Sequence, residues 1–226
     1  MKARKFLLGL VASVMSLSIA PAVAAELEAS AGVDLVSSYV WRGAYQGQGA
    51  ALQPGMGIAV GGFTIDAWGS TPLDASAGKE LDFTVGYEFG CGLSLAVTDY
   101  WWEGEGAKYF TYDNHYLEVA LGYTISEDVP LTFGIATMVA GADEDFSTYI
   151  SVDYGFGIGA VDANVFAGIT PWSGIYNDGF GVASVGISFS YDLVSSDKFS
   201  LPIFVETSFS PCNDNAYIVA GLSFAL

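Results

Sequence analysis

From about residue 29 onward, the chain repeats one pattern: roughly ten residues in which apolar and small or polar positions alternate, followed by a turn. In the clearest case Leu81, Phe83 and Val85 share one face of an extended strand, and Asp82 and Thr84 share the other. The alternation recurs near residues 29–41, 52–60, 62–70, 81–89, 92–102, 117–125, 130–140, 150–158, 160–170, 184–191, 199–209 and 216–226. It predicts an all-β protein with about twelve strands.

The smaller residues distinguish two all-β architectures. A soluble sandwich exposes its second face to water and usually carries Lys, Glu, Arg and Thr there. Here the second face carries Gly, Ser, Ala and Thr with isolated carboxylates, as in 117–125 and 150–158. A membrane barrel directs large apolar side chains to lipid and small or polar ones to the lumen. The pattern favours a transmembrane antiparallel up-and-down β-barrel, with a soluble barrel or sandwich as the alternative.

The expected connections alternate in length along the chain. The short ones are Gly61-Gly62, Gly90–Gly92, Ser126–Val129, Gly157–Gly159 and the slightly longer Leu193–Lys198. The longer ones are richer in acids, Gly and aromatics and span 43–51, 70–78, 103–114, 141–146, 171–179 and 210–215. Short periplasmic turns opposite longer extracellular loops are typical of outer-membrane barrels. Both termini would then be periplasmic, which requires an even number of strands.

The N-terminal residues have the organisation of a secretory signal peptide. Lys2, Arg4 and Lys5 form a positive region, 6–20 is apolar, and Ala22-Val23-Ala24 resembles a cleavage site. The apolar run is short for a membrane-spanning helix, which needs about 20 residues. We expect residues 1–24 to be the signal peptide and 25–226 to form one barrel domain in the outer membrane.

Composition excludes two classes of protein. The chain has 7 Lys and Arg against 25 Asp and Glu, a net charge of −18, yet 52% of its residues are hydrophobic. High apolar content excludes intrinsic disorder. The acidity excludes a nucleic-acid partner, because phosphate binding requires Lys and Arg.

All five tryptophans lie where an expected strand enters a longer loop. Indole rings favour the membrane–water interface, where one edge is apolar and the N–H is hydrated. The sequence therefore predicts an aromatic girdle at one end of the barrel, formed by Trp41, Trp68, Trp101, Trp102 and Trp172.

The last strand carries a candidate assembly signal. Outer-membrane proteins commonly end in a strand with a Gly followed by spaced aromatic or apolar residues. Gly221, Phe224 and the terminal Leu226 follow this pattern, although the last residue is usually Phe. We expect the barrel-assembly machinery to bind this strand, and outer-membrane lipid and lipopolysaccharide to surround the finished barrel.

Three segments resemble the TorF-type porins of Gram-negative outer membranes. They are Ser38-Tyr39-Val40-Trp41-Arg42-Gly43 with the following Ala51–Gly55, then Ala67–Ser70, and finally Glu80–Tyr87. Val40-Trp41 departs from the family's Arg–aromatic pair. The resemblance covers roughly the first third of the expected mature chain and implies an outer-membrane barrel more firmly than it implies transport.

Strand parity directs nine charged side chains into the lumen, where an aqueous environment avoids the cost of charge in lipid. These predicted pore-lining residues are Asp34, Arg42, Asp66, Asp82, Glu88, Glu118, Asp153, Asp162 and Glu206. An open lumen of this charge would pass small solutes with a preference for cations. In the alternative, Asp82, Glu118 and neighbours pair with Arg42 in a closed plug, and the protein is a structural or surface-interaction barrel.

The remaining motifs point to no cofactor and no metal. Gly155, Gly157 and Gly159 lie between two strands, whereas a dinucleotide fingerprint requires a strand-to-helix junction. The acidic tip Asp143–Asp145 reads as a solvated turn, with Ca²⁺ or Mg²⁺ binding as an alternative. A barrel hydrolase centred on His115, the single histidine, is a third function hypothesis, but no serine stands out as its partner. We therefore expect a protein that is not an enzyme.

Overall fold

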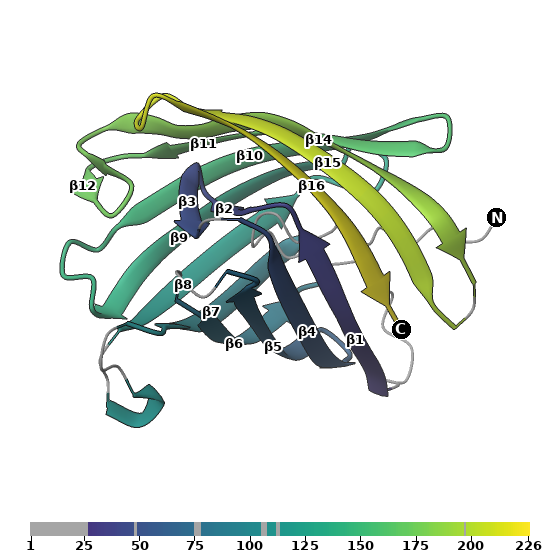
Figure 1. Cartoon of the computed structure of the whole chain (residues 1–226), viewed down its shortest axis with the longest axis horizontal. Coiled ribbons are helices and arrows are strands. Elements are labelled where there is room, and N and C mark those ends of the chain that lie inside the picture. The colour runs from purple at the N-terminus through teal and green to yellow at the C-terminus, as the bar shows by residue number, and fades with distance from the viewer. Residues whose placement is uncertain (1–26, 48, 75–77, 105–107, 112–113, 197) are drawn as a thin grey trace.

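The computed structural model describes residues 27–47, 49–74, 78–104, 108–111, 114–196 and 198–226. The predicted signal peptide lies outside these residues. Twelve antiparallel strands form one closed barrel, in which β1 and β16 pair to close the cylinder (Figure 1). They are β1 (Leu27–Val36), β4 (Ala51–Val60), β5 (Phe63–Pro72), β6 (Glu80–Glu88), β7 (Leu93–Trp102), β8 (His115–Thr124), β9 (Leu131–Gly141), β10 (Thr148–Ile158), β11 (Val161–Thr170), β14 (Gly181–Ser195), β15 (Ser200–Ser210) and β16 (Asn215–Ala225).

The predicted all-β barrel and its strand number are confirmed. Each barrel strand pairs with its sequence neighbours, which is the up-and-down order expected from the repeating strand–turn pattern. No helix in the described ranges is long and apolar enough to cross a membrane.

Strand parity gives the barrel an apolar outer wall. Cross-strand partners share a face, and the row Ile65, Val85, Val97, Val119 runs across β5 to β8 on the outside. Phe83, Leu121 and Ile135 are likewise exposed on the outer surface. Because a closed barrel satisfies every backbone hydrogen bond between strands, such a wall is compatible with lipid.

The connections separate into two ends (Figure 1). The turns β4–β5, β6–β7, β8–β9, β10–β11 and β14–β15 are short and lie at the end where β1 begins and β16 finishes. The opposite, long-loop end carries two small hairpins, β2 (Tyr39–Trp41) with β3 (Ala44–Gly47) and β12 (Ser173–Gly174) with β13 (Asn177–Asp178). A short 3₁₀ segment, η1 (Tyr109–Thr111), also lies there.

The first expected strand, 29–41, is longer than the observed one. β1 ends at Val36, and the chain bends at Ser37 before it forms the β2–β3 hairpin. The Ser37 amide donates to the Ala220 carbonyl at 2.8 Å, which holds the bend against β16. The extended pattern continues because Tyr39–Trp41 is itself a strand, but it belongs to a separate sheet.

Candidate functional site

The β2–β3 hairpin, residues 39–47, is the centre of the candidate site. Its two-residue turn is Arg42-Gly43, with φ values of 48° and 80°. Positive φ at both positions is the hairpin turn whose twist matches that of the flanking strands, and glycine adopts it without strain. The hairpin therefore presents the Arg42 side chain at its tip.

Arg42 inserts into the barrel and binds Glu118 on β8. Its Nη2 donates to Glu118 Oε1 at 2.9 Å and its Nη1 to Oε2 at 2.5 Å, and both side chains are buried. Tyr100 also donates to Glu118 Oε1, at 3.0 Å. This two-pronged arrangement is the strong form of an arginine–carboxylate bond, and it corresponds to the Arg42–Glu118 pairing of the plugged alternative.

Aromatic rings surround the Arg42 guanidinium. Its Cζ lies 4.5 Å from the Trp41 ring centroid, 4.9 Å from that of Tyr149 and 5.8 Å from that of Tyr176. The Tyr176 hydroxyl, between β12 and β13, also accepts a hydrogen bond from Nη1 at 2.5 Å. Burial raises the pKa of Tyr176 to about 12, although Arg42 acts to lower it, so the phenol is neutral at ordinary pH. Cation–π contacts of this kind are stronger away from water.

Apolar packing fills part of the long-loop end of the lumen. We call this cluster the mouth cluster: Trp41, Tyr100, Met138, Tyr176 and Ala183. A second cluster holds the hairpin against the wall near the barrel closure, and it consists of Val36, Val40, Ala51, Phe204 and Val219. Together they place a dry core inside the barrel, at the end where both small hairpins fold.

Backbone contacts hold the hairpin in place. Gly43 packs so closely that a Cβ there would lie 1.9 Å from the Ala183 carbonyl oxygen. The Asn213 side chain donates to the Gly43 carbonyl at 3.0 Å from the β15–β16 loop. A glycine is therefore required at position 43 for packing as well as for its φ.

The lumen widens toward the short-turn end because its side chains become smaller. In one inward row, Ser94, Gly122, Gly134 and Ser151 are cross-strand partners on β7 to β10. Nearer the mouth, inward positions carry large residues such as Tyr100. The result is a cavity of about 1060 Å³, which includes space open to solvent.

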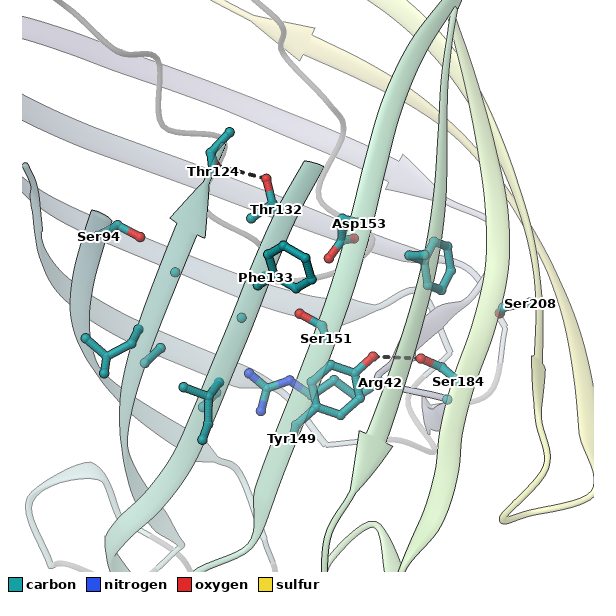
Figure 2. A pocket seen from close by; sticks show the side chains of 18 of the residues that line it. Arg42, Ser94, Thr124, Thr132, Phe133, Tyr149, Ser151, Asp153, Ser184 and Ser208 are labelled. Atoms are coloured by element: carbon teal, nitrogen blue, oxygen red, sulfur yellow. Dashed lines mark hydrogen bonds between the residues drawn. The ribbon is translucent and has the colours of Figure 1, made fainter. Parts of the chain in front are cut away.

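Acidic side chains line this cavity beneath the hairpin. Asp153 and Glu206 border it, together with Glu88 near the short-turn end. Figure 2 shows Arg42 beside Tyr149, whose hydroxyl bonds to Ser184, with Asp153 further along the same strand as Tyr149. The cavity thus has an arginine at its mouth end and carboxylates along its length.

The structure places all nine predicted pore-lining side chains toward the lumen. Arg42, Glu88, Asp153 and Glu206 border the cavity. The others share inward faces through cross-strand or polar contacts: Asp34 with Ser223, Asp66 with Thr84, Asp82 with Tyr100, Glu118 with Thr98, and Asp162 with Ser190. Their role in conduction stays a prediction.

The girdle prediction is wrong for three of the five tryptophans. Trp41 belongs to the mouth cluster because the hairpin folds inward and buries its ring. Trp68 is the cross-strand partner of Asp82, and Trp102 is that of Glu80, so both share the inward face of those acids. Position at a strand end does not decide direction, whereas parity does.

The other two tryptophans lie outside the lumen. Trp101 is on the outer face and contacts the Tyr109 ring, with centroids 5.6 Å apart. Trp172 is about half exposed in the β11–β12 connection and donates to the Phe146 carbonyl at 3.1 Å. Their positions are compatible with the interface that the sequence predicts.

His115 lies on the outer face and forms a pair with Asp99. Its Nδ1 lies 2.8 Å from Asp99 Oδ1, and its Nε2 lies 2.7 Å from the Tyr109 carbonyl. Asp99 is an outward carboxylate that parity could have identified, since Phe83 and Leu117 are its cross-strand partners. Both ring nitrogens are therefore engaged, by Asp99 and by the Tyr109 carbonyl, and the hydrolase stays a hypothesis.

The acidic tip and the C-terminal signal occupy the expected segments. Asp143 accepts from the Ser147 amide at 2.8 Å and from its hydroxyl at 2.7 Å, so it braces the β9–β10 turn. Among the described residues, no three His, Cys, Asp or Glu side chains form a metal-binding group. Gly221 lies under the Phe204 ring, Phe224 faces outward, and Leu226 is exposed; their part in assembly stays a prediction.

Fold and site together define a closed twelve-stranded barrel of the membrane-spanning class, with an apolar wall and charges kept inside. Residues 21–196 match the Gcw_chp family, which is described as a bacterial protein of unknown function, and the chain belongs to this family. The TorF-type resemblance stays a prediction.

The curated proteins and the solved structures provide two further comparisons. No curated protein matches the chain. Among solved structures, a triple mutant of the Rhodopseudomonas blastica porin is similar with a TM-score of 0.44 and 14% identity, over 78% of this chain and 55% of the porin chain. This chain thus spans about half the length of that porin chain.

Proposed function

We propose that the protein is an outer-membrane channel that passes small cations when the β2–β3 hairpin leaves the mouth. The observation that carries the proposal is the combination of an acid-lined cavity with a separate hairpin that closes one end of it. The apolar outer wall supports a location in the membrane, and the signal-peptide pattern of residues 1–24 supports export.

The charge of the lumen supports a preference for cations. Inward carboxylates outnumber inward cations, and Arg42, the one Arg or Lys among the described cavity-lining residues, is neutralised by Glu118. Asp153 and Glu206 face the open part of the cavity with no cation paired to them in the described contacts. Walls of low dielectric strengthen such a field, and screening over about 8 Å at physiological salt reduces it only partly.

The hairpin supports gating rather than a permanently open pore. It is joined to the barrel strands through bends at both ends, and its contacts within the lumen are made by side chains and by a few loop groups. Because β2 and β3 form a sheet of their own, the hairpin can leave the lumen without breaking a ladder of the barrel, and hinged movement of such elements is common in switching proteins. Movement of the hairpin would remove Val40, Trp41 and Arg42 from the lumen together.

Planar-bilayer recording tests the proposal. The wild-type barrel should give rare, short openings, and a variant in which residues 39–47 are replaced by a Gly/Ser linker should give long-lived steps. In both, the reversal potential should favour K⁺ over Cl⁻. Replacement of Asp153 and Glu206 by Asn and Gln should reduce that preference, whereas Glu127→Gln, in an exposed turn, should not.

Each failure has a distinct meaning. A linker variant that is folded, as judged by heat-modifiable migration in detergent gels, but gives no steps would overturn the channel. Steps with no cation preference would leave a channel but overturn the role of the carboxylates. The second candidate function, a permanently closed structural barrel, rests on the mouth cluster and predicts that the wild-type barrel gives no openings.

A further inference from the structure

We propose that the long-loop mouth contains a divalent-cation site formed by Glu80, Asp82 and Gln53, with Ca²⁺ as the best-fitting ion. The site lies above the acid-lined cavity and is bordered by a separate pocket of about 270 Å³, counted with its open side. It does not depend on conduction, because a channel that never opens would still contain it.

The register of the sheet brings the three side chains together. Glu80 and Asp82 are two residues apart on β6 and face the lumen. Ser70 on β5 is the cross-strand partner of Glu80. The Gln53 Nε2 on β4 donates to the same Ser70 hydroxyl at 3.4 Å, so polar side chains from three adjacent strands meet here.

These oxygens are buried and lack hydrogen bonds of standard geometry. Glu80 is only 4% exposed, and neither of its carboxylate oxygens makes a hydrogen bond of standard geometry. Asp82 Oδ1 and Gln53 Oε1 also lack hydrogen-bond partners, and these two residues are 6% and 2% exposed. Leaving such groups unsatisfied lowers the stability of the folded protein, most of all for charged groups, and a bound cation would offset that loss.

No ion pair in the described part of the chain involves Glu80 or Asp82. Lys79 adjoins Glu80 in sequence, but its ammonium lies on the exposed surface, 3.6 Å from Glu103. Arg42 is engaged by Glu118. The Tyr39 hydroxyl is close enough to Glu80 to interact with its carboxylate, but a phenol carries no positive charge.

The donor set favours a metal ion over an organic cation. Two carboxylates, an amide carbonyl and a hydroxyl are hard oxygen ligands, and their irregular arrangement suits Ca²⁺ better than the strict octahedron of Mg²⁺. An organic ammonium would need free aromatic faces. Here Tyr39 is stacked on Trp102 with centroids 6.2 Å apart and meets Trp68 edge-on at 5.5 Å, so the rings face one another.

Binding to the folded barrel tests the site without any current measurement. After treatment with a chelator, Ca²⁺ titration should show saturable binding and should raise the unfolding temperature in detergent. Tb³⁺ added in its place should emit by energy transfer from the neighbouring indoles of Trp68 and Trp102. Glu80→Gln should weaken Ca²⁺ binding at least tenfold, and Glu80→Gln with Asp82→Asn should abolish both effects.

A matched acidic pair provides the control. Glu144→Gln with Asp145→Asn removes two exposed carboxylates from another loop at the same end of the barrel, and it should leave Ca²⁺ binding unchanged. Loss of binding in this control, or retention of full binding in the Glu80 and Asp82 double variant, would overturn the site. So would equal stabilisation by Na⁺ or tetramethylammonium, or no binding by a wild-type barrel that shows heat-modifiable migration.

Discussion

Arg42 and Glu118 are 76 residues apart in the chain and are joined by two hydrogen bonds inside the barrel. One residue is at the tip of a small hairpin and the other is on a barrel strand, so this pair connects the element that closes the mouth to the wall. Arg42 belongs to the Ser38–Gly43 segment, and this segment places the Arg42 charge and the Trp41 indole within the lumen.

Glu118→Gln should destabilise the barrel. Removal of one partner leaves the Arg42 charge buried beside a neutral amide, and the cost of breaking a buried pair in this way is about 3–5 kcal/mol. Chemical unfolding in detergent or lipid vesicles, followed by tryptophan fluorescence, measures it. The hairpin should also become more mobile, because its strongest polar contact is lost.

A double replacement separates the charge from the packing. Arg42→Met with Glu118→Leu should recover most of the lost stability, since neither charge is then left unpaired. Glu127→Gln in the exposed β8–β9 turn is the matched control and should change stability by less than about 0.5 kcal/mol. If Glu118→Gln behaved like Glu127→Gln, the pair would not hold the hairpin.

Gly43→Ala should displace the hairpin from the mouth. The added methyl would meet the Ala183 carbonyl, and φ is +80°. Gly49→Ala is a close control, because φ is +79° there and nothing lies within 4 Å of the added methyl. The chain contains only Arg4 and Arg42, and the first lies in the predicted signal peptide. An arginine-specific protease should therefore cut folded Gly43→Ala at Arg42 and spare both wild type and Gly49→Ala.

The barrel was predictable because it depends on a local rule. A period of two along each strand fixes which side chains face out, and turn lengths fix the two ends. Asp82 and Glu118 are inward for this reason alone. The same rule would have placed Glu80, Trp68 and Trp102 inside, but the girdle prediction used only the position of each tryptophan along its strand.

The hairpin was not predictable in the same way. Tyr39–Trp41 continues the alternating pattern of β1, and no residue in it specifies that the chain turns into the barrel. That direction is set by contacts distant in sequence, such as Val40 with Val219 and Gly43 with Ala183. A pattern read along one strand contains no information about them.

His115→Ala should destabilise the barrel through Asp99. The substitution leaves a carboxylate on the outer wall without its imidazole partner, and because the pair is partly exposed we expect a loss of about 1–2 kcal/mol. Folding equilibria in lipid vesicles measure the loss. The double variant Asp99→Asn with His115→Ala should be more stable than His115→Ala alone, and the absence of any such recovery would contradict a role for the pair.

The two cysteines report which end of the barrel faces outward. Cys91 is exposed in the β6–β7 turn, and Cys212 lies in the β15–β16 loop at the opposite end. If the long loops are extracellular, a bulky maleimide that cannot cross the outer membrane should label Cys212 in intact cells expressing the Cys91→Ser variant. Labelling should be slow at neutral pH, because burial raises the pKa of the Cys212 thiol and the thiolate is the reactive form.

In the Cys212→Ser variant, Cys91 should react only after the cells are permeabilised. The reverse result would place the short turns outside and would turn the hairpin, the mouth cluster and the proposed Ca²⁺ site toward the periplasm.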